Sequence, residues 1–191
     1  MKRIFLATLG LGMIANVAAA SAQGNPFGSG QTDMPWSVNH PTLETSGIAA
    51  LAEEAASAFD VYGVNYSRAV EFGATDKAQL VRRIASQIGR TVSVPDLTAS
   101  GYSFMGGRLV ATPHGAAGLM MYSNGRGQRL LMLVRPMAID QDTRMSEHSY
   151  GDINGFTWAI KGMGFSLVGP APADLLHPIA NEARRQEGET I

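Results

Sequence analysis

Four histidines are the side chains best suited to chemistry in this sequence: His40, His114, His148 and His177. No two of them have the short spacing that is typical of metal sites, and the chain has no cysteine to supply a thiolate. Ser149, His148 and Asp152 contain the residue types of a hydrolase triad, but no nucleophile-elbow motif accompanies them. The sequence therefore predicts neither an enzyme nor a cofactor.

The methionines, ten in all, suggest a second kind of chemistry. Thioether and imidazole groups suit soft metals such as copper, and Met120, Met132, His114 and His148 would be the ligands of such a site. Methionines on apolar strands also fill irregular gaps in a core. Adjacent Met120 and Met121 must point to opposite faces of a strand. Core packing is therefore favoured, and periplasmic copper binding remains the alternative.

Residues 1–22 have the three parts of a secretory signal: a basic start, an uncharged apolar run and small residues before a cleavage site at Gln23. The alternative is an uncleaved anchor, although the run is short for a bilayer. We expect a periplasmic protein, or one anchored in the inner membrane with its domain on the periplasmic side. A membrane contact is expected only if this segment is retained.

The remaining chain is expected to form one domain. Residues 23–42 are rich in Gly, Pro, Asn and Ser and predict a flexible linker or arm. Residues 43–185 predict the folded domain, and residues 186–191 a charged tail. The formal net charge of -1 offers no basic field for nucleic acid, so nucleic-acid binding is not expected.

Three segments have the apolar periodicity of helices that pack one face on a core. They cover residues 43–62, 75–88 and 172–185. Thr75 is expected to cap the second helix, and Gly89 to end it in a left-handed conformation. Pro178 is expected to kink or interrupt the third, because its ring cannot continue the helical hydrogen bonds.

The stretch between the second and third helices predicts an antiparallel sheet of about five strands. Gly106-Gly107 interrupts the first long strand, which is typical of a bulge. The apolar runs 118–122 and 130–134 are too continuous for strands with one wet face, so we expect central strands covered on both sides. Residues 136–151 predict a polar connection, and 156–167 a second hairpin. The fold class is α+β, with two N-terminal helices and one C-terminal helix packed on the sheet.

A set of short motifs lies along this predicted sheet: Pro95, Asp96, Leu97, Gly101, Gly106, Gly107, Arg108, Leu109 and Arg135. Their order resembles the extracytoplasmic, sensory domain of bacterial transmembrane anti-sigma factors, over roughly residues 60–180. These residues are mainly structural in character, because glycine and proline set backbone geometry. Arg108 and Arg135 are the polar exceptions. Pairing with Asp96 or another acid of the sheet is favoured for them over ligand binding.

Members of that family place a sigma-binding domain, often with a His/Cys zinc motif, before the membrane span. Here only Met1 to Arg3 precede the apolar run, so direct sigma-factor binding is not expected. The resemblance implies a stand-alone relative of the sensory half. It would be a non-enzymatic regulatory domain that binds a protein partner in the envelope, or an envelope signal.

Overall fold

The computed structural model describes residues 47–63 and 70–190, all of which lie in the unit Asn39–Ile191. The predicted signal peptide, the predicted linker and the start of the first predicted helix lie outside the described residues. None of the helices within the described ranges has the length and apolar character needed to cross a membrane.

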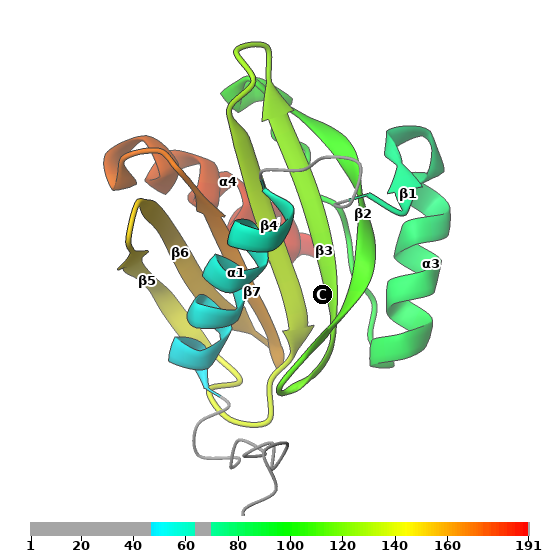
Figure 1. The fold of residues 1–191 in the computed structure, drawn as a ribbon. Helices are drawn as coiled ribbons and strands as arrows, with labels where there is room; N and C mark the ends of the chain where they lie inside the picture. Colours follow the sequence, from blue (N-terminus) through cyan, green and yellow to red (C-terminus); the bar gives the residue numbers. More distant parts are fainter. Residues whose placement is uncertain (1–46, 64–69, 191) are drawn as a thin grey trace, which may run out of the picture. The chain divides into compact units, whose positions relative to one another are not determined.

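Within the described residues, seven antiparallel strands form one sheet in the order β1-β2-β3-β4-β7-β6-β5 (Figure 1). Their bounds are Phe72–Gly73 (β1), Tyr102–Thr112 (β2), Gly115–Asn124 (β3), Arg129–Pro136 (β4), Thr143–Tyr150 (β5), Ile153–Ile160 (β6) and Met163–Gly169 (β7). The predicted α+β class with an antiparallel sheet is confirmed. The expected number of about five strands was wrong.

One missed strand is β5, which occupies most of the expected polar connection over residues 136–151. Among the described strands, it forms an edge of the sheet and pairs with β6 alone; most of its side chains are exposed and show no apolar alternation. Main-chain hydrogen bonds to β6 form the strand without help from the side-chain pattern. The other missed strand, β1, is two residues long.

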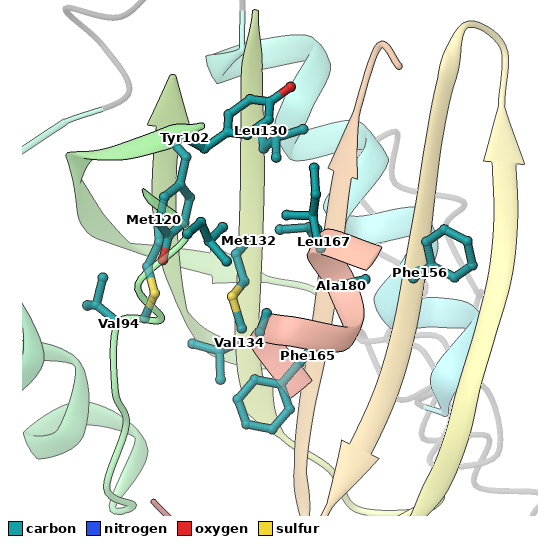
Figure 2. Close-up of a cluster of buried hydrophobic side chains, with 14 of the residues drawn as sticks. Val94, Tyr102, Met120, Leu130, Met132, Val134, Phe156, Phe165, Leu167 and Ala180 are labelled. Carbon is teal, nitrogen blue, oxygen red and sulfur yellow. The ribbon is translucent and has the colours of Figure 1, made fainter. Parts of the chain in front are cut away.

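The central strands β3 and β4 are covered on both faces, as their continuous apolar runs predicted. Alternate residues of β4 belong to two different core clusters: Leu130, Met132 and Val134 to one, and Leu131 and Leu133 to the other. Figure 2 shows the first cluster, in which side chains from β3, β4 and β7 gather with Ala180 of α4. The sheet is therefore the middle layer of three.

The helices divide between the two faces. The helix α1 (Ile48–Tyr62) packs Leu51, Ala55 and Phe59 on one face. The helices α3 (Lys77–Ile88) and α4 (Ala173–Thr190) cover the other face, where their apolar side chains belong to the first core cluster. In Figure 1, α1 lies in front of the sheet and α4 lies behind it.

The helix ends differ in part from the expectations. Gly89 ends α3 with φ 69°, as predicted. The expected cap at Thr75 was wrong, because Asp76 stands at the N-cap and makes no side-chain capping bond. The helix α4 continues through Pro178 without interruption and extends to Thr190, beyond the expected end at residue 185. The part of α4 beyond residue 185 contacts the Val92–Leu97 segment, as described below.

The predicted bulge is confirmed. The pairing of β2 with β3 shifts between Phe104 and Gly106, and Gly106 has φ 135°. A Cβ atom at Gly106 would lie 2.3 Å from the carbonyl oxygen of Phe72 in β1. Only glycine combines this backbone conformation with so close an approach of the neighbouring strand.

Candidate functional site: a groove along helix α1

A groove of about 580 Å³ runs between α1 and the turn that joins β2 to β3. Its α1 wall consists of residues three and four apart: Ala50, Glu53, Glu54, Ser57, Ala58, Val61 and Tyr62. This row lies beside the buried row of Leu51, Ala55 and Phe59, so α1 packs one face on the sheet and turns another to the groove. The second wall comprises Val110 to His114, and Leu133 of β4 also contributes.

A buried polar cluster joins the two walls of the groove. Arg135 Nε donates to Glu54 Oε2 at 2.6 Å, and His114 Nδ1 lies 2.5 Å from Glu54 Oε1. The side chains of Arg135, Glu54 and His114 are only 1%, 7% and 10% exposed. Burial strengthens such charge-assisted hydrogen bonds because water does not compete for their partners. The cluster fixes the position of α1 relative to β4.

Each member of this cluster comes from a different kind of element. Arg135 is the last buried residue of strand β4, and Glu54 lies on the flank of the α1 stripe. His114 stands in the β2–β3 turn, where its backbone N–H donates to Thr112 Oγ1 at 3.2 Å. The Thr112 hydroxyl in turn donates to the carbonyl of Gly115 at 3.0 Å. The turn therefore holds the imidazole in one place.

The cluster leaves one polar atom with a distinct chemical role. Nδ1 of His114 is engaged by the Glu54 carboxylate, so Nε2 is the ring nitrogen left for another partner. His114 Nε2 is buried and has no hydrogen-bond partner among the described residues. It can therefore form a hydrogen bond with a polar group of a ligand, as acceptor or donor according to the tautomer.

One end of the groove is apolar and open. Val61 is 60% exposed, which is unusual for a large apolar side chain in this domain. The ring of its neighbour Tyr62 lies under the guanidinium of Arg108, whose Cζ is 5.3 Å from the ring centre. This cation–π contact ties the end of α1 to β2.

The predicted pairing of Arg135 with an acid is confirmed, but the acid is Glu54 of α1 and not Asp96 or a residue of the sheet.

The ligands of the predicted copper site lie on two faces of the sheet. Met120 and Met132 pair across β3 and β4 and are fully buried on the α3/α4 face. His114 contacts α1 on the other face, and His148 of β5 contacts Thr157 and Ser166, which also point away from the Met120 cluster. The fold does not bring these four side chains together. The described residues hold no group of three or more His, Asp or Glu side chains placed to hold a metal.

His148 belongs to a buried hydroxyl network and not to a triad. Its Nε2 lies 2.6 Å from Thr157 Oγ1, which is 2.8 Å from Ser166 Oγ. Burial lowers the pKa of His148 to about 4, so the imidazole is neutral near pH 7. Ser149 instead donates to Asn154 Oδ1 at 2.6 Å, and Asp152 is exposed. The Ser149, His148 and Asp152 set is therefore not assembled.

The motif residues of the central stretch have structural surroundings. The carbonyl of Pro95 accepts the buried Tyr122 hydroxyl at 3.0 Å. Asp96 accepts from the backbone N–H and the hydroxyl of Thr98, and the backbone bond is the main reason why its pKa is lowered. Leu97 is buried, and Gly101 has φ 83° after a short 3₁₀ turn. Leu109 packs against the α3/α4-side core.

Sequence reasoning missed Glu54, the centre of the cluster. A signal was present, because Glu54 lies three residues after buried Leu51 and immediately before buried Ala55, on the border of the apolar stripe. A carboxylate at that border, in a chain with an arginine at the end of an apolar strand, is compatible with a buried pair. The partner itself could not be chosen, because 81 positions separate Glu54 from Arg135.

No protein-family model, curated protein or solved structure matches this chain. Function therefore has to be inferred from the groove, its polar cluster and the resemblance that the motif residues carry. The fold class alone does not specify a function, because one fold can host many unrelated sites.

Proposed function

We propose that this protein is an exported, non-enzymatic regulatory or sensory domain, similar to the periplasmic part of anti-sigma factors. In this proposal it binds a protein partner of the cell envelope, or an envelope signal, in the groove along α1. The observation that carries the proposal is an open groove with an apolar end, built over a buried Arg135–Glu54–His114 cluster. Concave sites with apolar walls and few fixed polar groups are typical binding sites.

The polar cluster supports binding more than catalysis. Both Glu54 oxygens are engaged by neighbours, so the carboxylate is not available as a free general base. The same contacts hold the groove in one shape before any ligand arrives. A preorganised site loses less conformational entropy on binding, which favours affinity.

The wall provided by α1 supports a protein partner in particular. Ala50, Ser57 and Ala58 are small, and they let another main chain approach closely. Exposed Val61 supplies an apolar contact at one end, and Glu53 lines the groove about two helical turns away. A helix or extended segment laid along such a wall buries apolar surface in the way that peptide-recognition grooves do.

Photo-crosslinking provides a matched test of the groove. A photoreactive amino acid replaces Val61 in one variant and Leu175 of α4 in the other, because the two side chains are 60% and 59% exposed. We expect irradiation in the intact envelope to yield a specific adduct from position 61 and none from position 175. Mass spectrometry identifies the partner, and the proposal predicts an envelope protein and not a sigma factor.

A second variant separates binding in the groove from chance collision. Ser57→Trp fills the groove from an exposed position on α1, so it should remove the position-61 adduct without unfolding the domain. Circular dichroism checks the fold. Equal adducts from positions 61 and 175, or an adduct that survives Ser57→Trp, would show that the groove is not the binding surface.

A further inference from the structure

A single carboxylate interrupts the buried apolar face of α4. Leu176, Ala180 and Ala183 are fully buried at successive helical steps, and Glu187 takes the next position of the same row. Glu187 is also 0% exposed. Acidic side chains are almost never fully buried unless they are paired. The last turns of α4 therefore bury the Glu187 carboxyl group, whose ionised form water would solvate far better than the protein does.

Glu187 lies close to Ser93 of the Val92–Leu97 segment and to Tyr122 of β3. Beside it, Gln186 and Asp96 form a reciprocal pair: the Asp96 N–H donates to Gln186 Oε1 at 2.8 Å, and Gln186 Nε2 donates to the Asp96 carbonyl at 2.9 Å. Neither Glu187 oxygen reaches a partner in good hydrogen-bonding geometry among the described residues. The nearby Ser93 side chain offsets the effect of burial only in part.

Among the described residues, no cation forms an ion pair with Glu187. From β3 comes Tyr122, whose pKa burial raises well above 10, so this phenol stays neutral. From the 92–97 segment comes the Asp96 carboxylate, and from α3 comes Lys77, whose Nζ donates to the Val94 carbonyl at 3.0 Å. On α4 itself, Arg185 is engaged by Glu182 and Glu189. The Arg184 side chain also lies on α4, with a buried Nε atom.

We propose that the protonation state of Glu187 controls the docking of the end of α4. The protonated carboxyl stays buried and keeps Gln186 in reach of Asp96. The ionised carboxylate moves to water, and the last turn of α4 leaves the Val92–Leu97 segment. The domain thus contains a latch, made of Glu187, Gln186 and Asp96, that opens as the pH rises.

The direction follows from proton linkage. Burial raises the pKa of Glu187 from 4.5 to about 7, so the docked state binds the proton more tightly than the released state. Docking is therefore weakened as the pH rises from 4.5 to about 7, and is constant above that range. With these two pKa values, the docking equilibrium should fall about 30-fold between pH 5.5 and pH 8.5.

Amide hydrogen exchange on the full chain, followed by NMR, tests the latch. The Asp96 amide is a direct reporter because it donates to Gln186. Its protection factor, which corrects for the intrinsic effect of pH on exchange, should fall about 30-fold from pH 5.5 to pH 8.5. The amides of the last turn of α4 should follow it, while those of the central strand β4 should not.

Three variants decide the outcome. Glu187→Gln and Glu187→Leu cannot ionise, so each should keep Asp96 equally protected at both pH values, and the second serves if the first fails to fold. Glu189→Gln removes an exposed glutamate two positions away and should keep the wild-type response. A wild-type protein without the response, or a response that persists in both Glu187 variants, would overturn the proposal.

Discussion

Arg135 Nε lies 2.6 Å from Glu54 Oε2, and this contact joins the central strand β4 to the middle of α1. The two side chains are almost completely buried, so neither charge has water as a substitute partner. A buried pair of this kind contributes little compared with a well-packed apolar pair, but it is costly to break. It therefore defines where α1 lies, and with it the shape of the groove.

The variant Arg135→Met should lower the free energy of unfolding by about 3 to 5 kcal/mol, because it leaves the Glu54 carboxylate buried without its main partner. Urea denaturation measures the change. The double variant Glu54→Leu/Arg135→Met removes both charges and should recover much of this loss. If the double variant loses as much stability as Arg135→Met and a single Glu54→Leu variant lose together, the two residues are not coupled.

The variant Gly106→Ala should lower the free energy of unfolding by about 2 to 4 kcal/mol. A Cβ atom would meet the Phe72 carbonyl in β1, and φ 135° is strained for any residue except glycine. Gly125→Ala is the matched control, because nothing lies within 4 Å of its added Cβ and its φ is not in the left-handed region. Thermal unfolding compares the two, and similar losses would contradict the role of the bulge.

His148 should make the domain less stable in acid. Its pKa is about 4 in the fold and 6.5 when unburied, so below pH 6.5 the unfolded chain takes up a proton that the folded protein rejects. The stability lost between pH 6.5 and pH 4 should be about 1 to 2 kcal/mol, after allowance for the partial exposure of the ring. Urea titrations at several pH values measure it.

His148→Gln should flatten this acid-side slope, whereas His177→Gln, at an exposed position on α4, should leave it unchanged. Glu187 acts in the opposite direction, because its raised pKa makes stability fall as the pH rises from 4.5 to about 7. The two contributions oppose each other between pH 4.5 and 6.5. An unchanged slope in His148→Gln would mean that another group causes the acid sensitivity.

Lys161→Asn should stabilise the β6–β7 hairpin by about 0.5 to 1 kcal/mol. Lys161 has φ 48°, a left-handed conformation that asparagine adopts more readily than lysine. The bonds of Lys161 to Asp142 and Arg90 use its backbone, so the substitution keeps them. Gly162→Ala should have the opposite effect, since φ is 79° and the new Cβ would meet Arg90. A lower melting temperature for Lys161→Asn would refute this reading of the turn.

The sequence predicted those parts of the fold in which the pattern of apolar and polar side chains matches their burial in the structure. The continuous apolar runs of β3 and β4 required cover on both faces, and the structure has helices on both. β5 could not be predicted in this way, because Thr143–Tyr150 is an exposed edge that main-chain bonds hold together. The end of α4 was missed for a related reason: Gln186 and Glu187 resemble a solvated tail until the Val92–Leu97 segment covers them.

The candidate site was less accessible to sequence reasoning. Arg135 was singled out as an arginine that would pair, yet its partner was sought in the sheet. Glu54 and His114 are 60 positions apart. No local sequence pattern indicates that the β2–β3 turn contacts α1 on the face of the sheet. Interactions of this kind depend on the tertiary arrangement, so they appear only when the strand order is known.

The strand order β4-β7-β6-β5 also affects how the chain can be made. A chain is synthesised from its N-terminus, so β4 emerges together with β3 but before β7, its neighbour on the other side. Until Met163–Gly169 has emerged, the most apolar strand of the domain is an unpaired sheet edge that other chains could join. A holding chaperone would protect that edge during synthesis. A chain that stops before β7 should aggregate, even though β1 to β4 are intact.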